Sequence, residues 1–164
     1  VHFDFEPDGK TTPQPEAMRM PEVIHGLRNL IKNAVDFAKD NVWIEARWTA
    51  DTILIRVIDD GPGFPTDMTG RIGDPFVRRR TSLQSTRKRP EYQGMGLGLF
   101  IAKTLLERTG AELSFNNGAD PYLLRTEWPD KCGAIVEVSW PRHAVAFSQQ
   151  ASRDALGEND QITE

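Results

Sequence analysis

Apolar residues recur at three- and four-residue spacing between residues 21 and 39, which predicts an amphipathic helix with one buried face. Pro21 suits the first turn of this helix. A second helix is expected over residues 97–108, stopped by Gly110. The buried stripe of the first helix comprises Val23, Leu27, Leu30, Ile31, Ala34 and Ala38.

Segments rich in β-branched and aromatic residues predict strands over 42–49 and 52–58, and the two residues between them indicate an antiparallel hairpin. Further strands are expected over 2–5, 112–116 and 134–140. Strands and helices do not alternate as in β-α-β units. The pattern therefore favours an α+β fold, a two-layer sandwich of a mixed sheet with helices on one face.

The length of 164 residues suits one domain, expected over 1–142 and followed by a polar tail over 143–164. No membrane-spanning run or signal peptide is visible, and the net charge of -4 argues against nucleic-acid binding. A single cysteine, Cys132, excludes an internal disulfide, and with three histidines a Cys/His zinc site is not expected.

Three glycines at alternate positions, Gly94, Gly96 and Gly98, run into the second helix. Glycine allows close backbone approach, and the free amides and positive dipole at a helix N-terminus attract anions. The segment therefore indicates a phosphate cradle. It matches neither a dinucleotide fingerprint nor a Walker A loop, since Leu99 and Asp4 stand where glycines are required. A plain glycine-rich turn is the alternative.

The first helix carries a second, polar face with Asn29, Asn33 and Asp36, which Phe37 extends. Amide oxygens can ligate Mg²⁺, which usually also keeps waters and substrate phosphates. A solvated helix face is the alternative interpretation.

Asp59 ends a predicted buried strand and precedes Gly61-Pro62-Gly63. A carboxylate there could accept a hydrogen bond from the exocyclic amine of adenine, and the glycines would let a flat base lie against the backbone. An ordinary Asp-Gly loop is the alternative. Two basic clusters, 78–80 and 87–89, lie in a segment without regular pattern and could form a cationic flap over a triphosphate.

Taken in order, these motifs resemble the N, G1, F and G2 boxes of histidine-kinase ATP-binding domains, in the gyrase, Hsp90, kinase and MutL superfamily. The boxes are Asn29-x-x-x-Asn33-Ala34, Asp59-x-Gly61-x-Gly63, Asp74-Pro75-Phe76 and Gly94-x-Gly96-Leu97-Gly98-Leu99. The residues in and around these boxes are similar to those of the redox-responsive RegB/PrrB sensor kinases. The resemblance implies the Bergerat ATP-binding fold over 1–142, with a lid at about 77–93.

The resemblance also implies the cofactors ATP and Mg²⁺ and a set of roles. Asn33, assisted by Asn29, would ligate Mg²⁺; Asp59 would read the adenine amine and Phe37 would stack on the ring. Arg78 would reach the terminal phosphates, so Asn29 and Arg78 are the expected catalytic residues. Asp36 stands where many kinases have a lysine. The remaining expected nucleotide-binding residues are Gly61, Gly63, Phe76, Gly94, Gly96, Leu97, Gly98 and Leu99.

Hydrolases of this superfamily carry a glutamate where this chain has Asn29, and an amide is no general base at neutral pH. This favours transfer of the γ-phosphoryl group to a histidine on a separate helical dimerisation domain. A response regulator would then receive the phosphoryl group from that histidine. His2, His25 and His143 are expected at the surface, so the chain should bind ATP without phosphorylating itself. The fragment should be monomeric, and the parent kinase a homodimer in the inner membrane with this domain in the cytoplasm.

Three alternatives stay open. The chain could be an ATPase or clamp protein of the same superfamily, an anti-sigma-type serine kinase, or a nucleotide-binding interaction module whose site has decayed.

Overall fold

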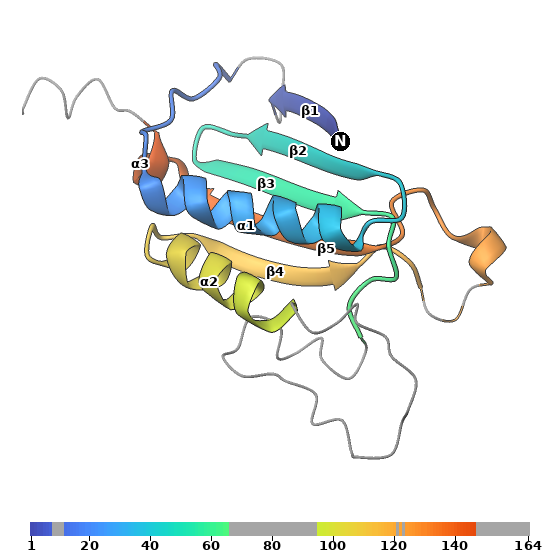
Figure 1. Cartoon of the computed structure of the whole chain (residues 1–164). Helices are drawn as coiled ribbons and strands as arrows, with labels where there is room; N and C mark the ends of the chain where they lie inside the picture. Colours follow the sequence, from blue (N-terminus) through green and yellow to red (C-terminus); the bar gives the residue numbers. More distant parts are fainter. Residues whose placement is uncertain (8–11, 66–94, 121, 123, 147–164) are drawn as a thin grey trace, which may run out of the picture.

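The computed structural model describes residues 1–7, 12–65, 95–120, 122 and 124–146, which form one five-stranded sheet with helices on one face (Figure 1). The strands are β1 (His2–Pro7), β2 (Val42–Trp48), β3 (Thr52–Asp59), β4 (Glu112–Asn117) and β5 (Ala134–Pro141), in the spatial order β1-β2-β3-β5-β4. β1 runs parallel to β2, and the other neighbours are antiparallel. The predicted hairpin, mixed sheet and α+β sandwich are confirmed.

Helices α1 (Pro21–Phe37) and α2 (Met95–Glu107) lie side by side and run in opposite directions (Figure 1). α1 ends two residues before the predicted position. α2 begins at Met95 rather than at residue 97, so the helix includes Gly96 in addition to Gly98. Both helices therefore bring one end to the same edge of the fold: the C-terminal end of α1 and the N-terminal end of α2.

Two short helices complete the described part: η2 (Arg125–Glu127) in the 118–132 loop and α3 (Arg142–Val145) after the last strand. The predicted 143–164 tail is described only as far as Ala146, where Val145 and Ala146 are buried against the core. No helix in the described ranges combines the length and the apolar composition needed to cross a bilayer.

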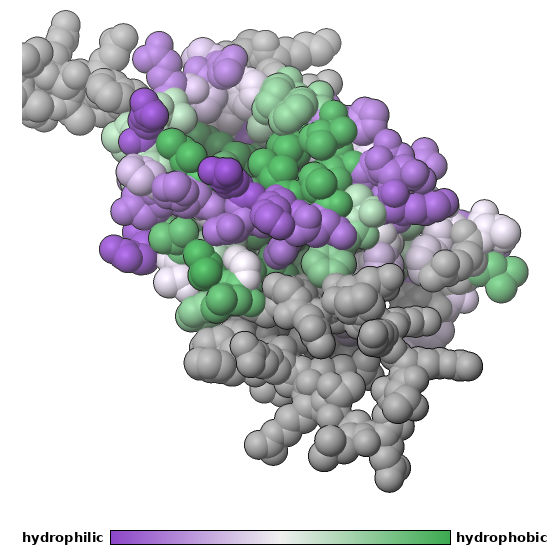
Figure 2. Space-filling view, viewed as in Figure 1, coloured by the Kyte–Doolittle hydropathy of each residue, from purple (hydrophilic) through white to green (hydrophobic). Residues whose placement is uncertain are grey.

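The core lies between the helices and the sheet, because alternate residues of β3 and β5 point to the helix layer. Cross-strand pairs such as Ile53 with Trp140 and Val57 with Val136 are buried there. Gly26 of α1 lies against Leu106 of α2, where an added Cβ would come within 2.5 Å of the leucine Cγ, so the two helices pack closely at this point. Figure 2 shows the resulting polar outer face of α1 as a hydrophilic band.

Asp60, directly after β3, ties the turn between α1 and β2 to the sheet. Its carboxylate accepts hydrogen bonds from the backbone amides of Lys39, Asp40 and Asn41 at 2.8–3.2 Å, and from the Asn41 side chain at 3.1 Å. Partial burial acts to raise the pKa of Asp60, but these donors outweigh it and hold the pKa below its usual value. The end of α1 is thereby fixed beside the end of β3.

Asp60→Asn should lower the free energy of unfolding by about 1 kcal/mol at neutral pH, because one acceptor of this cluster becomes a donor facing other donors. Since the pKa of Asp60 is depressed in the folded state, its contribution is complete above the pKa of an unfolded aspartate. It is lost as the pH falls through the lower folded value. Urea unfolding between pH 7 and pH 3 measures this difference.

Asp36→Asn is the matched control, since within the described part of the chain Asp36 makes only an exposed ion pair with Lys32 on the surface of α1. Equal stability of the Asp60 and Asp36 variants at neutral pH would contradict the role assigned to Asp60.

Candidate functional site

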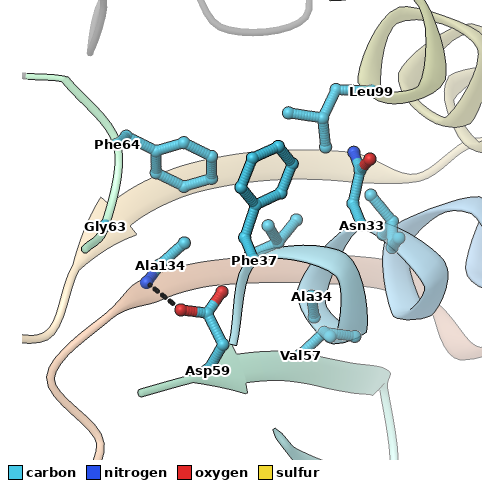
Figure 3. A pocket seen from close by; sticks show the side chains of 11 residues that line it. Asn33, Ala34, Phe37, Val57, Asp59, Gly63, Phe64, Leu99 and Ala134 are labelled. Atoms are coloured by element: carbon cyan, nitrogen blue, oxygen red, sulfur yellow. Dashed lines mark hydrogen bonds between the residues drawn. The ribbon is translucent and has the colours of Figure 1, made fainter. Parts of the chain in front are cut away.

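A pocket opens where four elements end or begin: the last turns of α1, the first turns of α2, the end of β3 and the start of β5 (Figure 3). Most of its wall is apolar, and two polar side chains, Asn33 and Asp59, face it from different elements. An apolar pocket with few polar groups at fixed positions is typical of a small-molecule site. The wall is formed by Leu30, Asn33, Ala34, Phe37, Val57, Asp59, Gly63, Phe64, Leu99, Ala134 and Val136.

Asp59 is the buried acid of this pocket, with a side chain held from one side only. It is 3% exposed, and its Oδ1 accepts hydrogen bonds from the backbone amides of Gly61 at 2.9 Å and Ala134 at 3.1 Å. Among the described residues no group donates to Oδ2, which points towards the pocket in Figure 3. The anchored carboxylate therefore presents one acceptor to a ligand.

Burial raises the pKa of Asp59 above its usual value; the two amide donors act in the opposite direction, and the neighbouring Asp60 adds to the increase. A carboxylate that is held out of water and has an acceptor to spare can form a charge-assisted hydrogen bond with an N–H donor of a ligand. The exocyclic amine of adenine is such a donor.

Gly133, which precedes β5, is a site residue that the sequence did not reveal. A Cβ there would lie 2.0 Å from Oδ1 of Asp59, and its amide donates to the Asp59 carbonyl at 2.9 Å. Gly118 donates to the Gly133 carbonyl at 2.8 Å, which closes the 118–132 loop at its base. Only glycine therefore allows β5 to start close enough for Ala134 to donate to Asp59. A glycine directly before a predicted strand was the available signal.

Asn33 lies on the side of the pocket next to α2. Its Nδ2 is buried and has no hydrogen-bond partner among the described residues. A Cβ on Gly98 would lie 3.4 Å from the Asn33 Oδ1, so the first turns of α2 pass directly beside this amide. A buried polar group without a partner needs an explanation, and a bound ligand supplies one. The free amides at the N-terminus of α2 make the same region favourable for anions.

Two phenylalanines border the pocket between these polar groups. Phe37, from the end of α1, and Phe64, from the segment after the Gly61-Pro62-Gly63 turn, point their rings into it (Figure 3). Phe64 is 6% exposed and also meets the Phe115 ring edge-on, with centroids 6.0 Å apart. Phe64 was not predicted; an apolar residue following a glycine turn was the only signal in the sequence.

The structure brings together Asn33, Phe37, Asp59, Gly63 and Leu99 at one pocket, and Gly98 lies beside Asn33. Three other predicted residues do not line it: Asn29 lies one turn earlier on α1, Leu97 is 69% exposed, and Gly61 is buried behind Asp59.

Gly61 has a packing reason of its own, since a Cβ there would lie 2.2 Å from the Phe37 carbonyl oxygen. Gly96 lies in the first turn of α2. Phe76, Arg78 and Gly94, with the predicted lid over 77–93, fall outside the described residues.

The described donors near the pocket fit a magnesium ion only in combination with a phosphate ligand. No group of three or more His, Cys, Asp or Glu side chains able to hold a metal occurs in the described ranges. Asp36 is paired with Lys32 at 2.5 Å on the surface. The amide oxygen of Asn33 is a candidate protein ligand, because Mg²⁺ is commonly held by few protein oxygens together with substrate phosphates and water.

The three histidines lie away from this pocket. His2, His25 and His143 are all exposed, and the Nε2 of His2 donates a hydrogen bond to Oδ1 of Asn41 at 3.0 Å while the ring stacks on Trp43. None of them lines the pocket.

Comparison with known proteins gives a consistent family. A model described as "Histidine kinase-, DNA gyrase B-, and HSP90-like ATPase" matches residues 20–144. The sensor histidine kinase RegB of Cereibacter sphaeroides is 59% identical over 160 residues, which is 97% of this chain and 34% of RegB. The sensor histidine kinase RcsC of Salmonella typhimurium is 32% identical over 114 residues, covering 69% of this chain and 11% of RcsC. The chain thus spans about a third of the length of its RegB relatives.

Solved structures show the same fold. Full-length ShkA in complex with AMPPNP superposes with a TM-score of 0.59 at 21% identity, covering 90% of this chain and 26% of ShkA. The catalytic domain of the histidine kinase ThkA gives a TM-score of 0.57 at 22% identity, covering 85% of this chain and 79% of that domain. The chain belongs to the family of histidine kinase-, DNA gyrase B- and HSP90-like ATPases, and its sequence is similar to the ATP-binding region of RegB sensor histidine kinases.

Proposed function

We propose that this chain binds Mg-ATP and donates the γ-phosphoryl group to a histidine on a separate helical dimerisation domain of the same kinase. The observation that carries the proposal is the buried Asp59 carboxylate, with one oxygen anchored by two backbone amides and the other facing an apolar pocket. The family match and the RegB relatives support the same function.

The adenine ring would enter between Phe37 and Phe64, and its exocyclic amine would donate a hydrogen bond to Oδ2 of Asp59. Guanine carries a carbonyl oxygen at the corresponding position, and an oxygen facing a carboxylate is repelled and loses its hydrogen bond with water. The anchored acid therefore selects adenine both by attraction and by rejection.

The triphosphate would extend from the adenine towards Asn33 and the N-terminus of α2. The helix amides and dipole would stabilise its negative charge, and Asn33 would supply its Oδ1, which lies beside Gly98, to Mg²⁺. When bound, the metal ion neutralises phosphate charge. The chain's own contribution to transfer is positioning and electrostatic stabilisation of the phosphoryl group, with Arg78 and the lid completing the site.

Asn29 stands one turn before Asn33 on α1, where it is half-buried. An amide at this place orients neighbours but accepts no proton from water, which favours transfer to a protein side chain over hydrolysis. The three histidines of this chain are exposed and lie outside the pocket, and the proposal places the acceptor histidine on another domain. A response regulator would receive the phosphoryl group next. The parent protein would be a dimeric, redox-responsive membrane kinase, as RegB-like proteins are expected to be.

Asp59→Asn should weaken Mg-ATP binding by about tenfold or more and reduce the preference for ATP over GTP, because the amide removes the charge and can donate to guanine. Calorimetric titration of both nucleotides into the wild type and the variant measures affinity and selectivity together. The thermal unfolding midpoint serves as the control for folding. Unchanged affinity and selectivity in a folded variant would remove Asp59 from the nucleotide site.

ATP affinity should also fall on acidification, and should begin to fall at a higher pH than an ordinary aspartate would cause. The pKa of Asp59 is raised by burial, so the free protein loses its carboxylate early as the pH drops, and the charged form is the one that binds the amine. Dissociation constants between pH 8 and pH 4.5 provide the measurement. Asp59→Asn is the matched control, since the ATP phosphates titrate alike in both proteins; parallel profiles would refute the prediction.

Asn33→Ala should abolish most of the gain in ATP affinity that Mg²⁺ produces, while leaving metal-free binding of the nucleotide much less affected. The reason is that the variant removes the amide oxygen next to the phosphate region but leaves the adenine pocket intact. Titrations with and without Mg²⁺ separate the two contributions. Lys32→Ala, an exposed change on the same helix, is the control; an equal Mg²⁺ effect in Asn33→Ala and wild type would exclude Asn33 as a ligand.

A further inference from the structure

The segment that carries Phe64 is held by one side chain from a distant strand. Asn117, the last residue of β4, accepts a hydrogen bond from the Phe64 amide through Oδ1 at 2.6 Å and donates through Nδ2 to the Phe64 carbonyl at 2.9 Å. Because the partners are a backbone donor and a backbone acceptor, they fix which way the amide faces. The side chain acts here as a neighbouring strand would.

Close packing adds to these two hydrogen bonds. Gly63 has a φ of +74°, and a Cβ at this residue would lie 2.7 Å from the Asn117 Oδ1. The backbone of 63–64 thus lies directly against the Asn117 amide. The neighbouring Phe115 ring meets Phe64 edge-on from the same strand. β4 therefore determines both the position and the tilt of the Phe64 ring.

Asn117 also belongs to the frame that holds Asp59. It pairs with Ala134 in the β4–β5 ladder, and the Ala134 amide donates to Oδ1 of Asp59 at 3.1 Å. The apolar wall at Phe64 and the acceptor at Asp59 are thus both held by the same short section of the β4–β5 ladder. A shift of Phe64 relative to Asp59 would change the width of the pocket and the direction from which a base reaches the carboxylate.

We propose that Asn117 is a positioning residue of the nucleotide site, which fixes the Phe64 wall relative to Asp59 and so determines how closely the base must fit. This inference rests on the proposed function, because it concerns the base-binding part of the same pocket. Asn117 does not line the pocket itself and acts through Phe64.

The test compares Asn117→Ala and Asn117→Asp with wild type. Alanine removes both hydrogen bonds; aspartate keeps the size and the acceptor, but it cannot donate to the Phe64 carbonyl and it repels it. Asn116→Ala is the matched control, since the neighbouring Asn116 is exposed and its side chain makes only a 3.4 Å contact with Ser114 among the residues that the structure describes.

Three ligands separate the base from the phosphates: Mg-ATP, Mg-ADP, and an ATP analogue with a bulky substituent on the adenine amine. Both Asn117 variants should bind Mg-ATP about tenfold more weakly, as expected for losing one or two net hydrogen bonds. The preference for ATP over the bulky analogue should narrow several-fold, while the ratio of ATP to ADP affinity stays as in wild type. Amide exchange at Phe64 should be faster in Asn117→Ala.

A merely structural role would lower the unfolding temperature without changing the base preference, and that result overturns the proposal. The proposal is also overturned if both variants keep the wild-type affinity for ATP, or if their loss of affinity changes the ratio of ATP to ADP affinity. If the wild-type chain bound no ATP, the proposed function itself would fail. If the wild type bound ATP and both Asn117 variants had the same ATP affinity and base preference as the wild type, only the positioning role would be removed.

Discussion

The arrangement of the site depends on one buried carboxylate. Asp59 is 3% exposed at the end of β3, and its Oδ1 is held by the amides of Gly61 and Ala134. Burying a charged acid is unfavourable unless hydrogen bonds compensate for the lost hydration. Here the two amide hydrogen bonds compensate only in part, since the pKa of Asp59 remains raised. The unsatisfied acceptor is what the pocket offers to a ligand.

Several features of the fold permit the close packing around Asp59. Gly133 leaves room for β5 to begin beside the carboxylate, and Gly61 lets the turn after β3 pass the last carbonyl of α1. Asp60 fixes that same end of α1 to β3 through four donors. The adjacent acids thus have different tasks: Asp60 is saturated with hydrogen bonds and holds the frame, whereas Asp59 is left partly unsatisfied and faces the pocket.

The sequence predicted what depends on local pattern. The apolar stripe of α1, the hairpin of β2 and β3, and Asp59 at a strand end are all visible in short windows of residues. Gly133, Ala134 and Asn117 were not predicted, because they act across 53 or more positions of the chain and mostly through backbone amides, which carry no residue signature. The start of α2 was predicted two residues too late: glycine suggests a loop, yet Gly96 is helical, and Gly98 lies beside Asn33.

The most direct test of the central claim is an experimental structure of the chain with Mg²⁺ and a non-hydrolysable ATP analogue. The claim predicts the adenine amine nitrogen at about 3 Å from the free oxygen of Asp59, with Ala134 still donating to the other oxygen. It also predicts the phosphates beside Asn33. A base bound elsewhere, or phosphates facing Asp59, would contradict it.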